Sequence, residues 1–209
     1  MSRVAVFDLD GTLVDSVDDL AASVNHALAT VGLPPRSRVE IQGFVGEGAR
    51  VLLERAVAPR LELLEPALAA WWVHYEAHCL DRTVAYPGVA ELLAGARRPL
   101  AVLTNKPGPL ARKIVDGLGL GRRFTEVVGG GEAPRKPDPA GLLAILARAG
   151  ASPADAVFVG DSRVDVATGL AAGVAVVAVT WGFASREALQ AAGATVLADR
   201  AEELARWVA

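Results

Sequence analysis

The chain has 209 residues, of which 52% are hydrophobic and 22% charged, and its formal net charge is −3. This length suggests one core domain with a smaller module, since a domain has about 150 residues, and the composition excludes a disordered chain. The weak negative charge argues against a nucleic-acid partner, the short apolar runs argue against a membrane span, and the single cysteine excludes an internal disulfide, so we expect a cytoplasmic protein.

Short apolar and β-branched runs predict buried strands, with helical patterns between them. In chain order, strands are expected at residues 3–7, 99–104, 125–128, 156–159, 175–179 and 195–197. Helices are expected at residues 110–118, 139–149, 164–172 and 187–192. This alternation predicts an α/β fold, a doubly wound and mostly parallel sheet of Rossmann-like type with helices on both faces.

The interval between the first two strands breaks the alternation. A strand–helix–strand unit needs about 30 residues, whereas about 90 residues separate these two strands. Apolar residues such as Leu20, Val24 and Val31 keep a helical period within this interval. We therefore expect residues 16–83 to form an inserted all-helical cap, and residues 1–15 and 84–209 to form the α/β core.

Polar residues collect where the predicted strands end. These residues are Asp8, Asp10, Thr104, Asn105, Lys106, Lys136, Asp161 and Asp165. In open α/β sheets, ligands bind at the carboxyl ends of the strands because the loops converge there. Several carboxylates in one crevice repel each other unless a cation is present, and carboxylate oxygens without His or Cys favour Mg²⁺. We therefore expect a Mg²⁺ site that also neutralises an incoming phosphate.

Asp8 and Asp10 lie two residues apart on an extended segment, so both side chains can address one substrate. A carboxylate that attacks phosphorus forms an aspartyl-phosphate, while a second carboxyl group can protonate the leaving oxygen and later activate water. Among the 21 basic residues only Lys106, Lys113 and Lys136 are lysines, and two of these stand at strand ends. A compact ammonium suits a phosphate deep in a site, although Lys106 also fits a plain surface lysine.

These motifs resemble those of the haloacid dehalogenase superfamily, in particular its phosphatase branch. The matching segments are Asp8-Leu9-Asp10-Gly11-Thr12, Thr104, Lys136 and Gly160-Asp161-Ser162-Arg163-Val164-Asp165. The resemblance implies that Asp8 is the nucleophile and Asp10 the general acid and base. It also implies that the inserted helices are the cap of one subclass, which closes over the site and excludes water.

The same resemblance implies a set of binding residues. Mg²⁺ would be held by Asp8, the Asp10 carbonyl and Asp161, with Asp165 in support. The transferring phosphoryl group would be held by Thr104, Asn105 and Lys136. The cofactor implied is Mg²⁺, and the partner is a small phosphorylated metabolite.

Within that branch the chain is most similar to phosphoglycolate phosphatases, through residues 44–49 and 51–55 of the cap and residues 135–139 of the core. This implies hydrolysis of 2-phosphoglycolate to glycolate and phosphate. Glu47 and Arg50 stand where such enzymes often carry other residues, which leaves their role in specificity open. We expect Arg50 to help bind a substrate carboxylate.

Other functions stay open on the sequence alone. A β-phosphoglucomutase-like phosphomutase shares the cap and motifs but phosphorylates a sugar instead of water, and pyrophosphate or nucleoside monophosphate hydrolysis also fits. A dehalogenase is disfavoured because such enzymes typically lack the second acid, Asp10. A catalytically silent binding or regulatory module is unsupported because every catalytic position is present. Both a monomer and a homodimer are compatible with the sequence.

Two further cap features are more typical of structure than of chemistry. His74 and His78 are four residues apart, as in a zinc pair, but no third ligand is evident, so we expect a packing or surface role. The aromatic residues Trp71, Trp72 and Tyr75 are expected to form the core of the cap.

Overall fold

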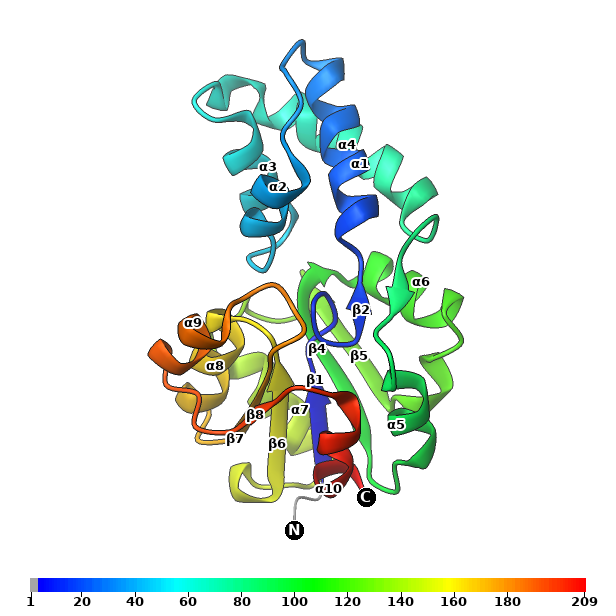
Figure 1. Ribbon diagram of the computed structural model, residues 1–209, viewed down its shortest axis with the longest axis vertical. Helices are drawn as coiled ribbons and strands as arrows, with labels where there is room; N and C mark the ends of the chain where they lie inside the picture. Colours follow the sequence, from blue (N-terminus) through cyan, green and yellow to red (C-terminus); the bar gives the residue numbers. More distant parts are fainter. Residues whose placement is uncertain (1–3) are drawn as a thin grey trace.

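The computed structural model describes residues 4–209 (Figure 1), so Arg3, where the first strand is expected to begin, lies outside the described residues. The main sheet consists of β1 (Val4–Phe7), β4 (Leu100–Pro107), β5 (Glu126–Gly130), β6 (Ala156–Gly160), β7 (Ala175–Val179) and β8 (Leu197–Ala198). Its strand order is β5-β4-β1-β6-β7-β8, and every neighbouring pair is parallel. The parallel sheet predicted from the sequence is confirmed.

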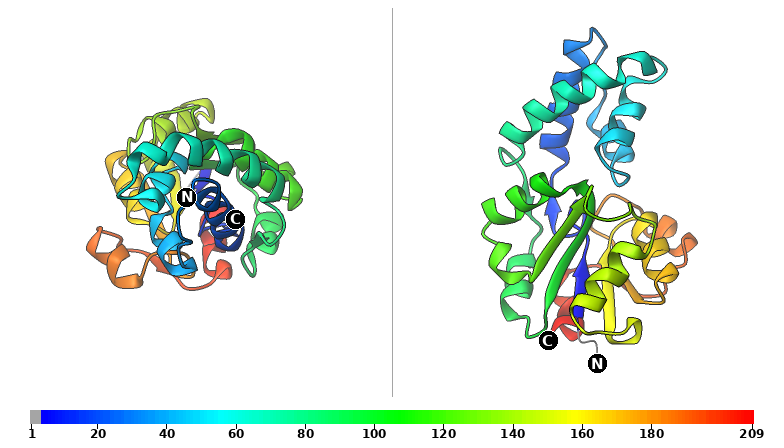
Figure 2. Two further views of the ribbon diagram at one scale, coloured as in Figure 1. Left: turned by 90° about the horizontal axis from the view of Figure 1, so that it is seen from above. Right: turned by 180° about the vertical axis from the view of Figure 1, so that it is seen from behind.

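Helices cover both faces of this sheet (Figure 2). One face packs against α5 (Val89–Gly95), α6 (Gly108–Gly117) and α10 (Ala205–Val208), and the other against α7 (Ala140–Arg148), α8 (Arg163–Ala171) and α9 (Arg186–Ala191). Alternate side chains of a strand point to opposite faces, so Ala5 and Phe7 enter the first core, while Val4 and Val6 enter the second. The doubly wound, Rossmann-like fold is therefore confirmed.

The interval after β1 is helical and lies above the carboxyl ends of the strands (Figure 1). It contains α1 (Val17–Thr30), α2 (Arg38–Phe44), α3 (Ala49–Val57) and α4 (Leu64–His78), with a short 3₁₀ turn, Leu61–Leu63. These helices pack on one another through buried residues such as Leu28, Leu53 and Trp71. The three aromatic residues expected in the core of the cap differ in burial: Trp71 and Tyr75 are buried, whereas Trp72 is 36% exposed.

Two chain segments connect these helices to the sheet. β2 (Val14–Asp15) and β3 (Val84–Ala85) pair antiparallel at this junction. The buried carboxylate of Asp19, at the start of α1, accepts hydrogen bonds from the Thr83 N–H and hydroxyl, both at 2.8 Å. This two-stranded ribbon is not predicted by the sequence, because two-residue strands leave no periodic signal.

The remaining elements are short 3₁₀ turns at Gly121–Arg123, Pro153–Asp155 and Ala201–Leu204. Within residues 4–209, no helix has the length and apolar character needed to cross a membrane.

Candidate active site

The loop after β1 turns sharply toward β6. Gly11 has φ +84°, and a Cβ atom there would lie 2.2 Å from a carboxylate oxygen of Asp161. Glycine alone adopts this conformation at little cost and leaves room for the carboxylate. Gly11 therefore lets the β1 loop and the Asp161 loop meet.

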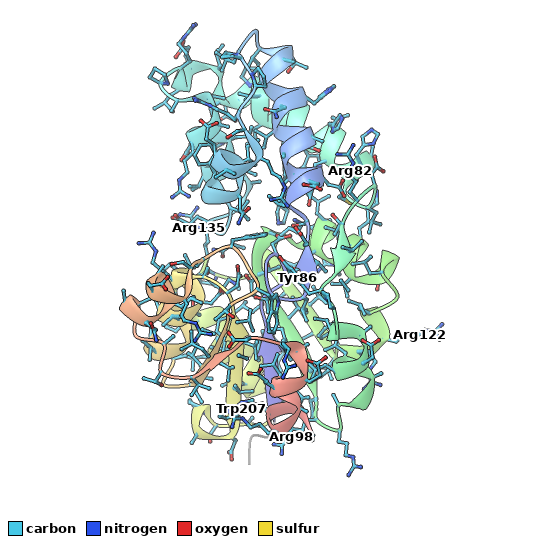
Figure 3. All side chains as sticks on the ribbon, in the orientation of Figure 1. Arg82, Tyr86, Arg98, Arg122, Arg135 and Trp207 are labelled. Carbon is cyan, nitrogen blue, oxygen red and sulfur yellow. The ribbon has the colours of Figure 1, made fainter. Side chains whose placement is uncertain are left out.

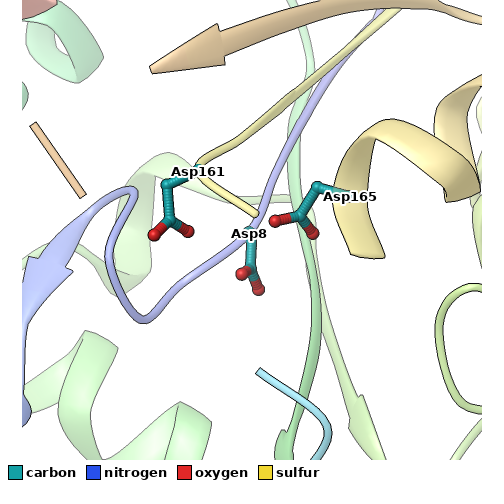
Figure 4. A group of neighbouring side chains, drawn as sticks. All are labelled: Asp8, Asp161 and Asp165. Carbon is teal, nitrogen blue, oxygen red and sulfur yellow. The ribbon is translucent and has the colours of Figure 1, made fainter. Parts of the chain in front are cut away.

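Asp8, Asp161 and Asp165 form one buried group, each offering an oxygen within 4.8 Å of the others (Figure 4). Burial, followed by the charge of Asp165, raises the pKa of Asp8 to about 7, although Lys136 opposes the shift. Burial and the charges of Asp165 and Asp8 also raise the pKa of Asp161 well above its ordinary value. A cation placed among these oxygens would favour the ionised carboxylates and so oppose the rise in both pKa values.

The donor set of this group fits a hard divalent cation. All three residues offer carboxylate oxygens, the ligand type that Mg²⁺ prefers. The buried Oδ1 of Asp8 is paired with the Lys136 ammonium at 2.8 Å. A carboxylate oxygen has more than one lone pair, so this contact leaves Asp8 able to bind a cation as well.

Lys136 joins two of these acids. Its ammonium lies 2.8 Å from Asp8 and 2.7 Å from Asp165, and its side chain is 2% exposed. Burial alone would lower the pKa of Lys136, but the charges of Asp165 and Asp8 raise it above the ordinary value. Lys136 is therefore held as a cation beside Asp8, where a phosphoryl group would need one.

Asp165 and Asp161 are each oriented by further contacts. Asp165 Oδ2 accepts hydrogen bonds from the Ser162 N–H and hydroxyl, in a capping box that begins α8. Asp161 accepts a hydrogen bond from the Thr12 hydroxyl at 3.2 Å and another from the Phe183 N–H at 2.7 Å. The contact of Phe183 with Asp161 leaves no signal in the sequence, since nothing in the local pattern of Phe183 places it there.

Asp10 lies in a second charged pair. Both of its carboxylate oxygens are 2.9 Å from the Lys106 ammonium, and the Ser16 hydroxyl also donates to it. The Lys106 side chain is 3% exposed, so Lys106 is not the surface lysine that the sequence left open as an alternative. The Lys106 ammonium also lies 4.8 Å from the centre of the Tyr75 ring, which connects the pair to the helical insertion.

Thr104, Asn105 and Lys106 follow a register shift in β4, between Leu103 and Pro107, which takes them out of the regular ladder. Thr104 and Asn105 line the same pocket as Asp8 and Asp10. The Asn105 amide nitrogen donates to the Gly46 carbonyl at 2.9 Å and to the Lys136 carbonyl at 3.1 Å. Its amide hydrogens are thus used by the protein itself, which ties the helical insertion to the Lys136 loop.

Arg50 is not brought to this group. It is exposed on α3 and makes an ion pair with Glu65 at 2.8 Å. The neighbouring Glu47 carboxylate pairs with Arg55, and its carbonyl accepts a hydrogen bond from Arg135 at 2.9 Å. Figure 3 shows Arg135 at the boundary between core and helical insertion.

A pocket of about 440 Å³, which includes space open to solvent, lies between the carboxyl edge of the sheet and the helical insertion. Its floor carries Asp8, Asp10, Thr104, Asn105 and Lys106. The carboxylates of Asp8 and Asp10 and the Lys106 cation thus surround one small volume, and Asp8 also belongs to the group of three buried carboxylates. This arrangement can hold and cleave a phosphate ester.

Comparison with known proteins agrees with this geometry. Residues 5–179 match the family model described as haloacid dehalogenase-like hydrolase. The chain belongs to the haloacid dehalogenase-like hydrolase family. Relatives of this family named phosphoglycolate phosphatase 1, from Pseudomonas aeruginosa, and phosphoglycolate phosphatase, from Rhodospirillum rubrum, are 41% and 40% identical to it. The first alignment covers 98% of this chain and 79% of the relative, and the second covers 100% and 91%.

A solved structure leads to the same family. The crystal structure of a predicted phosphoglycolate phosphatase from Haemophilus somnus 129pt superimposes with a TM-score of 0.93 at 31% identity, over 98% of this chain and 97% of that one. The enzyme is therefore a phosphatase of the haloacid dehalogenase-like family, as the motifs predicted.

Proposed function

We propose that the enzyme is a Mg²⁺-dependent phosphomonoesterase that hydrolyses 2-phosphoglycolate to glycolate and phosphate through an aspartyl-phosphate on Asp8. The observation that carries the proposal is the buried group of Asp8, Asp161 and Asp165 with the Lys136 cation beside it. The names of the relatives support the choice of substrate.

In the first step, an Asp8 carboxylate oxygen attacks phosphorus, and the bond between phosphorus and the glycolate oxygen breaks. The carboxylic acid of Asp10 gives its proton to the departing oxygen. In the second step, Asp10 takes a proton from water, whose oxygen attacks phosphorus and breaks the bond to Asp8. Each step transfers one proton through Asp10, so the enzyme returns to its starting state.

The other residues bind and orient the reacting groups. Lys136 lies beside Asp8 and balances charge on the phosphoryl oxygens, while Thr104 lines the same pocket. Mg²⁺, when held by Asp8, the Asp10 carbonyl and Asp161, would supply further positive charge at the phosphoryl group. We assign residues 16–83 to a cap domain that keeps water away from the site during the first step.

Phosphate release tests the proposal. The purified enzyme is offered 2-phosphoglycolate, ribose 5-phosphate, β-glucose 1-phosphate, AMP and pyrophosphate, each with Mg²⁺ and with EDTA. We expect the highest kcat/KM for 2-phosphoglycolate and no turnover in EDTA. Formation of glucose 6-phosphate without phosphate release would instead identify a phosphomutase, and a preference for AMP or pyrophosphate would overturn the substrate assignment.

A further inference from the structure

The cap side of the first pocket offers a substrate no charged side chain. This cap wall is formed by the side chains of Leu20, Val45, Ala49, Leu52 and Trp71. A second cavity, of about 900 Å³ including space open to solvent, opens from the same reacting carboxylates. Asp8 and Asp10 line both cavities, and the second one also reaches Arg163 at the start of α8. A substrate held at Asp8 can therefore extend toward Arg163.

The acidic residues of the second cavity already have counter-charges. Among residues 4–209, four acids line it, and three of them are paired with a basic side chain. These pairs are Asp8 with Lys136, Asp10 with Lys106, and Glu47 with Arg55. The fourth acid, Asp161, belongs to the buried group that fits a divalent cation. None of these four acids therefore neutralises Arg163.

Arg163 is exposed, and its side chain forms no hydrogen bond or ion pair with any other residue of the described range 4–209. Its backbone is fixed, because Ser162 and Asp165 form the capping box that begins α8. Arg163 follows Asp161 by two residues, so the two Cα atoms lie at most about 7.6 Å apart. No contact holds the guanidinium elsewhere, so it can turn toward an anion in the cavity that Arg163 lines.

Placement, rather than the missing partner, distinguishes Arg163 from other arginines. Arg122 is also exposed and has no side-chain partner within the described residues, but it lines neither cavity, and Figure 3 shows its side chain pointing outward from the core. Arg50 lines neither cavity and is paired with Glu65 at 2.8 Å. The free positive charge next to the reacting carboxylates therefore belongs to Arg163.

We propose that the Arg163 guanidinium binds the carboxylate of the substrate while the phosphoryl group lies at Asp8, and thereby favours 2-phosphoglycolate over phosphate esters that lack a carboxylate. This inference rests on the proposed function for the identity of the substrate. A guanidinium is always charged, and its planar fork of N–H donors matches the two oxygens of a carboxylate. Arg163 is thus a specificity-determining residue at a position to which the sequence motifs assign no role.

Binding of phosphonates tests the inference apart from catalysis. 3-Phosphonopropionate matches 2-phosphoglycolate with a carbon in place of the bridging oxygen, and propylphosphonate replaces its carboxylate by a methyl group. Both are titrated calorimetrically, with Mg²⁺ present, into the wild-type enzyme and three variants. Arg163→Gln removes the proposed contact, Arg122→Gln is the matched control, and Arg50→Gln removes the arginine that the sequence predicts to bind the carboxylate.

We expect Arg163→Gln to weaken 3-phosphonopropionate binding about tenfold, the lower end of the range for a charge-assisted hydrogen bond, and to leave propylphosphonate binding unchanged. Its melting temperature should equal that of the wild type, because the side chain has no partner within residues 4–209. Arg122→Gln should change neither affinity.

Three results would overturn the inference. Equal weakening of both ligands in Arg163→Gln would show that Arg163 does not distinguish a carboxylate. Unchanged binding of 3-phosphonopropionate would show that Arg163 does not contact it. Loss of carboxylate affinity in Arg50→Gln but not in Arg163→Gln would return the role to Arg50.

Kinetics separates this inference from the proposed function. The ratio of kcat/KM for 2-phosphoglycolate to that for ethyl phosphate should fall about tenfold in Arg163→Gln and stay constant in Arg122→Gln. If the wild-type enzyme prefers another ester but Arg163→Gln still loses affinity for 3-phosphonopropionate alone, the proposed substrate is wrong and the role of Arg163 stands. If 2-phosphoglycolate is preferred and the ratio does not change, the substrate stands and the role of Arg163 is wrong.

Discussion

The floor and the cap wall of the pocket hold their polar groups in opposite ways. On the floor, the side chains of Asp8, Asp10 and Asp165 are each paired with a lysine ammonium within 2.9 Å. On the cap wall the side chains are apolar apart from the buried Trp71 indole, whose N–H has no hydrogen-bond partner among residues 4–209. Buried charges are retained only when they are paired, whereas an apolar wall is stabilised by the burial of its side chains alone. The floor therefore depends on paired charges, and the cap wall depends on apolar packing.

The largest effect is expected from Asp8→Asn. An amide cannot attack phosphorus, so kcat should fall by at least about 10⁴-fold. The neutral side chain removes one of three crowded carboxylates, so the melting temperature should not fall. Phosphate release and thermal unfolding measure the two effects. Activity within tenfold of wild type would show that Asp8 is not the nucleophile.

Lys136→Met tests whether pairing holds the floor together. The change leaves the carboxylates of Asp8 and Asp165 without their shared cation, each 9% exposed or less. Removing one partner of a buried ion pair typically costs about 3–5 kcal/mol of unfolding free energy. We expect a loss of that size in urea unfolding with EDTA.

The control for this variant is Lys113→Met, which replaces an exposed lysine and should cost less than about 1 kcal/mol. Added Mg²⁺ should restore part of the stability lost in Lys136→Met, because it neutralises the same carboxylates. Equal stability of the two variants would contradict the assigned role of the pair.

Gly11→Ala tests the close approach of the β1 loop to Asp161. The new Cβ would lie 2.2 Å from an Asp161 oxygen at φ +84°, so both backbone strain and a clash are expected. Gly32→Ala is the matched control, because Gly32 has φ +73° with no atom within 4 Å of the added Cβ. We expect a cost of about 1 kcal/mol for Gly32→Ala and clearly more for Gly11→Ala.

Phosphate release distinguishes the two glycine variants further. Gly11→Ala displaces Asp161 and should lower kcat about tenfold or more, whereas Gly32→Ala lies in the cap and should leave kcat unchanged. If both variants lose the same stability and neither loses activity, Gly11 is required for its backbone conformation alone.

The floor could be predicted from the sequence because its residues follow strands. The carboxyl ends of parallel strands meet at one edge, so Asp8, Lys136 and Asp161 share a site once the strands are recognised. The Asp10–Lys106 pair could be predicted only in part. The scarcity of lysine marks Lys106 as unusual, but its partner depends on the direction in which the β4 bulge turns the Lys106 side chain.

The cap wall could not be predicted in the same way. The helical period places Trp72 and Tyr75 on the buried face, yet the structure buries Trp71 and Tyr75 and leaves Trp72 36% exposed. A periodic pattern also does not say whether the indole nitrogen finds a partner. That depends on which side chains of other elements come within reach. For the same reason the sequence does not predict the ion pair of Arg50 with Glu65, because this pair depends on how α3 and α4 pack against each other.

The smallest effect is expected in the cap, from the histidine stack. The His74 ring lies 4.2 Å from His26 of α1 and 4.4 Å from His78 of α4. Burial, followed by the charges of His26 and His78, lowers the pKa of His74, and the charge of Asp81 opposes this shift. The folded state therefore binds a proton less readily than the unfolded state, whose His74 keeps its ordinary pKa of 6.5.

It follows that the free energy of unfolding should fall as the pH drops below 6.5, because the unfolded state gains the proton first. Urea unfolding at pH 7.5 and at 5.5, in wild type and in His74→Gln, measures this contribution. The wild type should lose more stability between the two pH values than the variant does. An equal loss in both would show that His74 does not cause the acid sensitivity, and the floor carboxylates Asp8 and Asp161 would not explain it either, because their raised pKa values stabilise the folded state as the pH falls.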